Sequence, residues 1–487
     1  MRAADLLVVA AYFAATLWLG ARGGRRRAGQ GTDEYLVAGR TLPLTAFVVT
    51  LVATWYGGVL GVGEYSYEYG ISNWLVLGAP YYVAALLFAL LLAKKARASE
   101  DYTIPDLLFA TYGKAAGVIG TVTVFALTLP AAYLLMLGVL LRRIAGIGQG
   151  TAIVLAALFT LAYIVARGFR SVVETKGLQF TLMYGGFALL LPIAIGSAGG
   201  WSFLAASLPP EALAWDGGRG PGWVLAWYFI ALQTLVEPTF YQRCFAARSP
   251  RVAQLGVLAA IGCFVVFDAL TTFTGMYARA LLPGLPSGVD AFPALGEALL
   301  PTGLLGLFYA GMLATVMSTV DSFMLVGGVT IGRDLAWRLS GGRVDQLRWS
   351  RIGVALAAAL AAGIALASES VVALWYGFGS VGTAVLLFPL LGALHPRWRS
   401  HPRLVAPAML ASGGVTLGWL LLGGPEGPAL GVEPIVPGLA VAALFAGLGW
   451  GVARARGGAG AHAAHPRIRF KTRRSPRSGT GAAPGSQ

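Results

Sequence analysis

The chain has 487 residues, of which 57% are hydrophobic and only 12% charged, and its formal net charge is +15. A soluble protein of this length needs roughly twice that share of charge to cover its surface, so the composition excludes a soluble protein and indicates a membrane protein. The two cysteines make no disulfide framework. The four histidines all lie in polar stretches, which argues against a haem, an intramembrane metal site or a histidine proton relay.

A membrane-spanning helix needs about 20 apolar residues, and on that criterion the sequence predicts an all-α integral membrane protein with about thirteen spans. Several of the apolar runs are too long for one straight helix, which predicts tilts or breaks. The predicted spans lie near residues 3–21, 43–64, 73–95, 115–143, 151–167, 177–196, 221–240, 253–281, 301–335, 351–368, 371–394, 403–423 and 436–454.

The positions of the basic residues predict how the chain is oriented. With the N-terminus outside, nearly all of the 36 Lys and Arg residues fall on the inner side, as the positive-inside rule requires. We therefore expect a multi-pass protein of the cell (inner) membrane with a cytoplasmic C-terminus, whose residues 456–487 form a disordered basic tail. The exceptions are Arg2, Arg142, Arg143, Arg219 and Arg279.

The ninth predicted span carries hydroxyl side chains and one acid at membrane depth. Thr315, Ser318, Thr319 and Ser322 are spaced so that three of the four turn to one helix face. Two interpretations stay open: hydroxyls that bond their own i−4 carbonyls or hold neighbouring helices together, or hydroxyls that, with backbone carbonyls, ligate a hard monovalent cation. The intramembrane Asp321 favours a functional role.

Two other spans contain signals for a broken helix. The paired glycines Gly57 and Gly58 weaken the second span, although close helix packing is an equal alternative. Pro238 bends the seventh span just after Glu237, with the alternative that this helix ends at the inner surface and Glu237 pairs with Arg243. The two spans are five apart and run in opposite directions, which favours an inverted five-plus-five repeat. Weaker single signals come from Asp268, Trp375 and Tyr376.

Four segments together resemble the sodium:solute symporter family over about residues 30–395: DEYLVAGRTLP at 33–43, RSVVETKGLQF at 170–180, YQRCFAARSP at 241–250 and MSTVDSFMLVGGVTIGRDL at 317–335. The resemblance implies a LeuT-like core with one helix before it and two after it. The implied units are a first accessory helix with a basic loop (1–30), a first repeat (31–200), a second repeat (201–397), two accessory helices (398–455) and the basic tail (456–487).

The resemblance also implies a sodium site between the first and eighth core helices. Its ligands would be the carbonyls of Ala53, Tyr56 and Thr315 and the hydroxyls of Ser318 and Thr319. Many family members have Thr-Asp where this chain has Thr175-Lys176, and their Asp helps form a second sodium site. We therefore expect one sodium ion, with Lys176 and Asp321 as candidate coupling residues, unless Lys176 is a loop lysine that snorkels to the membrane surface.

The implied activity is secondary active transport: sodium-coupled symport of a small polar organic solute such as an amino acid, amine, carboxylate or sugar. A carboxylate at Glu237 fits a cationic or amine-bearing solute. The alternatives are a proton-coupled symporter, with Asp321, Glu237 or Lys176 as carrier, and, less favoured, a membrane-embedded enzyme or a channel. We expect the lipid bilayer and a solute as partners, not nucleic acid, and leave the oligomeric state open, a monomer included. The candidate solute residues are Trp55, Gly57, Gln233, Glu237, Trp375 and Tyr376.

Overall fold

The structure is a computed structural model that describes residues 1–25, 31–165, 168–368, 371–423 and 428–455. Its regular elements in those ranges are helices, and one isolated parallel bridge joins Leu42 to Ala247. The predicted tail lies outside the described residues. The first half contains α1 (Ala3–Arg25), α2 (Thr32–Val37), α3 (Leu44–Trp55), α4 (Val59–Tyr69), α5 (Ala79–Phe88), α6 (Lys94–Ser99), α7 (Ile104–Tyr112), α8 (Lys114–Leu127), α9 (Ala131–Ala145), α10 (Gln149–Ile164) and α11 (Phe169–Ala198).

The second half contains α12 (Trp201–Ser207), α13 (Pro210–Leu213), α14 (Pro221–Ile230), α15 (Pro238–Ala246), α16 (Pro250–Leu281), α17 (Ala291–Leu299), α18 (Leu304–Val329), α19 (Gln346–Leu366), α20 (Val371–Leu394), α21 (Pro402–Leu422) and α22 (Ile435–Ala455). Short 3-10 turns cover Ala38–Arg40, Tyr56–Gly58, Ala231–Val236, Gly288–Asp290, Pro396–Trp398 and Ala429–Gly431. Wider π-helical stretches cover Trp74–Gly78, Ala89–Ala93 and Thr330–Trp337.

Eleven helical segments among the described residues are long and apolar enough to cross a membrane. The two remaining predicted spans differ for separate reasons, so the count of thirteen is not confirmed. The apolar part of α10 is only Gln149–Ala162, which is short for a span. The span predicted at 221–240 is divided into α14, a 3-10 turn and α15, because Pro238 has no N–H to continue the helix.

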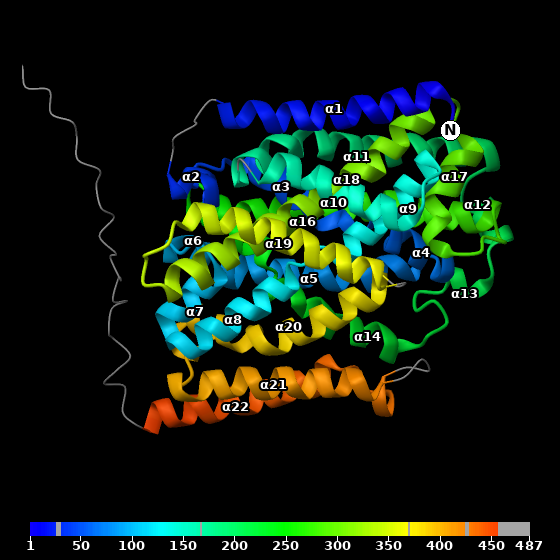
Figure 1. Cartoon of the computed structure of the whole chain (residues 1–487). Coiled ribbons are helices and arrows are strands. Elements are labelled where there is room, and N and C mark those ends of the chain that lie inside the picture. The colour runs from blue at the N-terminus through cyan, green and yellow to red at the C-terminus, as the bar shows by residue number, and fades with distance from the viewer. Residues whose placement is uncertain (26–30, 166–167, 369–370, 424–427, 456–487) are drawn as a thin grey trace, which may run out of the picture.

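The long helices run side by side through the molecule, and α18 lies at their centre (Figure 1). Helix α1 covers one side of the bundle, while α21 and α22 lie together on the opposite side (Figure 1). Every residue from Phe308 to Val329 on α18 is buried. The hydroxyls and the acid of the ninth predicted span therefore face protein on all sides rather than lipid.

The second predicted span is broken as its glycines suggested. Helix α3 stops at Trp55, a 3-10 turn covers Tyr56–Gly58, and α4 resumes at Val59. Glycine is required at position 57 because a Cβ there would overlap the side chain of Thr319 on α18. The break and the close approach of α18 are thus the same feature, so the two interpretations of these glycines do not exclude one another.

The end of the bundle where α3 begins is held shut by polar contacts, which we call the latch. The Arg40 guanidinium donates to the carbonyls of Phe245 at 3.1 Å, Glu100 at 2.6 Å and Asp101 at 3.1 Å. Backbone bonds tie Leu42 to the end of α15 at 3.1 Å and to Arg248 at 3.0 Å. The latch joins three chain segments at this end of the helices.

Candidate functional site

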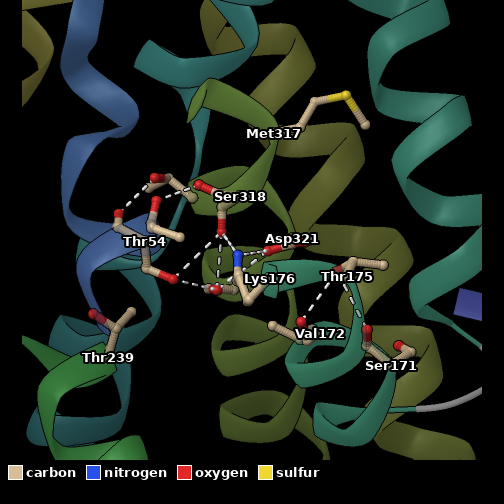
Figure 2. Close-up of polar contacts among 12 residues, drawn as sticks. Thr54, Ser171, Val172, Thr175, Lys176, Thr239, Met317, Ser318 and Asp321 are labelled. Atoms are coloured by element: carbon tan, nitrogen blue, oxygen red, sulfur yellow. Dashed lines mark hydrogen bonds and ion pairs between the residues drawn. The ribbon is translucent and has the colours of Figure 1, made fainter. Parts of the chain in front are cut away.

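The hydroxyls of Ser318 and Thr319 on α18 reach across to the backbone of α3, just before the helix break. Ser318 Oγ donates to the Ala53 carbonyl and, at 2.6 Å, to the Thr315 carbonyl. Thr319 Oγ1 donates to the Thr54 carbonyl at 2.5 Å. All of these residues are buried. Carbonyl and hydroxyl oxygens from two separate helices therefore converge at one buried point (Figure 2).

The hydroxyls of Thr315 and Ser322 also bond carbonyls within α18. Thr315 Oγ1 donates to the Gly311 carbonyl at 2.7 Å, and Ser322 Oγ donates to the Ser318 carbonyl at 3.1 Å. Both are i−4 bonds within the helix. Ser322 Oγ also lies 3.0 Å from Thr54 Oγ1 on α3, so Ser318, Thr319 and Ser322 all contact the neighbouring broken helix, whereas the Thr315 hydroxyl bonds within α18.

The convergent oxygens have the chemistry of a site for an alkali-metal ion. Four of the five predicted ligand residues, Ala53, Thr315, Ser318 and Thr319, are brought together by the contacts above. The carbonyl of the fifth, Tyr56, opens the 3-10 turn and accepts from the Val59 N–H. Hydroxyls that now donate to carbonyls have free lone pairs for a cation. Neutral oxygens on two helices suit a monovalent ion that is bound and released in each cycle.

Lys176 lies on α11, is fully buried, and does not snorkel from a loop. Its Nζ lies 2.6 Å from Asp321 Oδ1 and also donates to the Ser318 carbonyl. Figure 2 shows the amine between Ser318 and Asp321, beside the hydroxyl cluster. Burying an unpaired ammonium is costly, and the Asp321 carboxylate offsets that cost. The structure therefore joins the two predicted coupling residues in one ion pair.

Arg243 is a second fully buried cation. Its guanidinium donates to Thr54 Oγ1 at 2.7 Å, Ser322 Oγ at 2.9 Å and the Thr239 carbonyl at 3.0 Å. Glu237 instead caps α15, accepting from the Thr239 N–H at 3.2 Å and hydroxyl at 3.0 Å. The alternative in which Glu237 pairs with Arg243 at a helix end is thus wrong, because the chain restarts as α15 at Pro238.

A cavity of about 460 Å³ extends from the helix break to the end of the bundle where α4 ends. Ligand cavities for small molecules are of this size. Of the predicted solute residues, Gly57 is not part of the wall and instead faces Thr319. The other five all line it: Trp55, Gln233, Glu237, Trp375 and Tyr376.

The cavity wall is rich in aromatic rings and carboxylates, most of which sequence reasoning did not single out. Two pairs of these residues could have been found from the sequence. Glu64 and Glu68 on α4 are spaced i, i+4 and so share a helix face, and Trp223 and Trp227 on α14 do the same. No sequence pattern pointed to Glu433, because it lies in the connection between α21 and α22 and accepts a hydrogen bond from the Tyr376 hydroxyl there. The further aromatic and acidic wall residues are Tyr56, Tyr65, Tyr69, Tyr81, Tyr133, Asp268 and Phe323.

Comparisons with known proteins agree with this geometry. The family model described as "Sodium:solute symporter family" matches residues 35–393. The sodium/pantothenate symporter of Escherichia coli (strain K12) is 26% identical over 449 residues, covering 86% of this chain and 90% of that protein. The high-affinity choline transporter 1 of Caenorhabditis elegans is 26% identical over 436 residues, covering 80% of this chain and 73% of that protein.

Among solved structures, the substrate-bound outward-open state of a Na+-coupled sialic acid symporter superposes with a TM-score of 0.75. It has 17% sequence identity and covers 92% of this chain and 98% of that chain. This likeness shows the fold, which is LeuT-like.

The chain belongs to the sodium:solute symporter family, because the family model spans most of its length. It is therefore a multi-pass membrane transporter and not an enzyme. The prediction of the family and of an all-α, LeuT-like fold is confirmed.

Proposed function

We propose that the chain is a sodium-coupled symporter that carries a small polar organic solute by alternating access and binds one sodium ion between α3 and α18. The ion would take the carbonyls of Ala53, Tyr56 and Thr315 and the hydroxyls of Ser318 and Thr319. Because these ligands lie on two helices, ion binding stabilises the arrangement in which both helices meet. The support is the convergence of Ser318 and Thr319 on the carbonyls of α3.

Within that solute class, we favour an organic cation, either an amine or a quaternary ammonium compound. The observation that carries this choice is the cavity wall, which holds five carboxylates and, among the described residues, no Lys, Arg or His. Aromatic faces attract ammonium groups, and aromatic cages are a common way to hold quaternary ammonium ligands. Some relatives are named choline transporters, which fits this choice.

The expected direction of transport is inward. Under the positive-inside orientation, α3 begins on the inner side, so the latch closes the inner end and the cavity opens outward. Solute and sodium would then enter from outside, driven by the sodium gradient and the membrane potential. One charge that crosses about 100 mV is worth about 2.3 kcal/mol.

A thermal-shift screen of the purified protein tests the proposal. Choline, an amino acid, pantothenate and sialic acid are compared in NaCl and in KCl at equal ionic strength and fixed pH. A ligand of the folded state raises the melting temperature, and we expect choline or a related amine to do so only in sodium. Stabilisation by pantothenate or sialic acid alone would contradict the cationic solute. Stabilisation that ignores sodium but follows pH would favour proton coupling.

The substitution Glu237→Gln tests the cationic solute more directly, because it removes the buried carboxylate that the solute would face. We expect the solute affinity to fall roughly tenfold or more, about 1.4 kcal/mol, while sodium affinity without solute stays unchanged. The matched control is Glu211→Gln, an exposed acid outside the cavity. A loss of sodium affinity with unchanged solute affinity would instead place Glu237 in the ion pathway.

A further inference from the structure

Two carboxylates near the helix break face the cavity without a cation to balance them. Glu237 and Asp268 line the cavity, and each residue is only 7% exposed. Their hydrogen-bond donors are neutral groups: the N–H and hydroxyl of Thr239 for Glu237, and the Tyr82 hydroxyl for Asp268. Neither carboxylate forms an ion pair with another residue of the described ranges. A buried charge is costly unless it is paired, so a positive charge on the solute would be the missing partner.

A second pair of carboxylates lies nearer the open end of the same cavity. Glu64 and Glu68 are one turn apart on α4 and both line the wall, with Glu64 half-buried and Glu68 exposed. Within the described part of the chain, they too form no ion pair. Arg219 lies at this end, but its guanidinium stacks over the rings of Tyr69 and Trp223, 5.5 and 4.5 Å from their centroids. The cavity therefore carries uncompensated negative charge at two levels.

Helix geometry gives the distance between the two levels. Gly275 on α16 packs so closely against Ser66 that an added Cβ would overlap that side chain, and Ser66 lies between Glu64 and Glu68 on α4. Asp268 comes seven residues before Gly275 on the same unbroken helix, on the side of the helix break. Because an α-helix rises by about 1.5 Å per residue, the outer carboxylates lie roughly 10 Å beyond Asp268 along the bundle.

A solute with one ammonium group neutralises only one of these levels. A linear amine chain advances by about 1.25 Å per bond, because its bonds are about 1.5 Å long and its angles are tetrahedral. Two amines that are about six to nine bonds apart are therefore separated by roughly 7.5–11 Å, which matches the spacing of the two levels. Between the levels, α4 presents Gly61 and Val62 to the cavity, which suits an alkyl stem.

We propose that the preferred solute is a linear diamine or triamine, which lies along the cavity with one ammonium at Glu237 and Asp268 and another at Glu64 and Glu68. The inference rests on the proposed function, because it assumes an organic cation, and it deepens that function by requiring two separated charges. The linked contacts strengthen each other, since binding of the first ammonium holds the second close to its partner. A monocation such as choline makes only one of the two contacts.

A thermal-shift titration of the purified full-length protein tests the proposal with matched amines. Pentylamine, cadaverine (the five-carbon diamine), spermidine and choline are compared in NaCl and in KCl at equal ionic strength and fixed pH. Cadaverine differs from pentylamine only by its second amine. We expect cadaverine to reach half-maximal stabilisation in sodium at a roughly tenfold lower concentration than pentylamine, and spermidine to need no more than cadaverine.

The double substitution Glu64→Gln/Glu68→Gln locates the second ammonium. It removes the outer charges and keeps the size of both side chains, so we expect the advantage of cadaverine over pentylamine to disappear. The matched control is Glu211→Gln, which changes an exposed acid outside the cavity. In this control the advantage should remain as in wild type.

The outcomes separate this inference from the proposed function. If neither choline nor any of the amines stabilises the protein in sodium, the cationic solute is wrong and the inference falls with it. If choline or pentylamine stabilises wild type in sodium and the two polyamines do no better, the inference alone is overturned, and this result needs no variant to fold. An advantage of cadaverine that survives in Glu64→Gln/Glu68→Gln also overturns it, because the second ammonium would then lie elsewhere.

Discussion

At the scale of single residues, the account depends on two hydroxyls of α18 that reach carbonyls of α3. Most buried Ser and Thr side chains of this protein bond a carbonyl three or four residues earlier, as Thr315, Ser322 and Thr330 do. Ser318 bonds the Thr315 carbonyl in the same way but also donates to Ala53 on α3, and Thr319 donates to Thr54 on α3. An ion at this point would replace those hydrogen bonds with coordination by the same oxygens.

Ser318→Ala and Thr319→Ala should each weaken sodium dependence while the protein still folds. Each change removes one of about five ligands, and a contact to a charged group is worth about 1.5–3 kcal/mol. We therefore expect the sodium concentration needed for half-maximal solute stabilisation to rise roughly tenfold or more. Thr330→Ala, which removes a buried hydroxyl of the i−4 type elsewhere in the same segment, is the control and should leave that concentration unchanged. An equal effect at Thr330 would mean that general packing loss, not ligation, is measured.

At the scale of elements, the break between α3 and α4 brings a backbone close to α18, where the proposed ion would contact both. The bare face of Gly57 admits the Thr319 side chain, which any Cβ would displace. The second break, between α14 and α15, places Glu237 at a helix start, where it is a cap and also lines the cavity. Two breaks thus position the proposed ion site and the wall of the cavity.

Gly57→Ala tests whether this close approach matters. Overpacking a tight contact typically costs about 1–3 kcal/mol, and here α18 must move away from the carbonyls of α3. We expect weaker sodium binding together with a lower melting temperature. Gly262→Ala on α16 is the matched control, because nothing lies near its added Cβ, so a small gain of stability is expected from helix propensity. Unchanged sodium binding in Gly57→Ala would show that the break does not set the ion site.

The same elements show what could be predicted from the sequence. Paired glycines and a proline preceded by an acid mark both breaks, because these features are local. The hydroxyl spacing alone left two interpretations open, and the proposed ion ligands came from the family resemblance. The hydrogen-bond partners of Arg243 and Glu237 could not be predicted, because they depend on how α15 packs against α3 and α18. Likewise, Gly57 was expected at the solute, and only the packing of α18 shows that Thr319 occupies that side.

At the scale of the whole molecule, one end is open and the other closed. The cavity ends at the tip of α4, and the latch around Arg40 closes the opposite end. A carrier must exchange these roles, and the proposed inverted repeat of residues 31–200 and 201–397 would supply the two related arrangements. Breaking the latch should therefore shift the population toward opening at the latch end.

Arg40→Ala tests that shift, with the native thiol of Cys244 as the reporter. Cys244 lies buried on α15 next to the latch, and Cys263, the other free thiol, is replaced by Ala. Loss of about 1.4 kcal/mol of latch contacts changes the open population about tenfold, so maleimide labelling of Cys244 should speed up by a similar factor. Sodium should slow it again. The control is Arg248→Ala, which changes an exposed side chain nearby. If Cys244 were labelled at the same rate in Arg40→Ala as in this control, the Arg40 contacts would not hold this end closed.

The central claim is that a sodium ion is held between the backbone of α3 and the hydroxyls of Ser318 and Thr319. Its most direct test is saturation binding of radioactive sodium to the purified Ser318→Ala/Thr319→Ala double variant beside wild type. The account predicts one saturable site in wild type and no measurable site in the variant at the same concentrations. Equal binding by both proteins would contradict it, since the ion would then be held elsewhere.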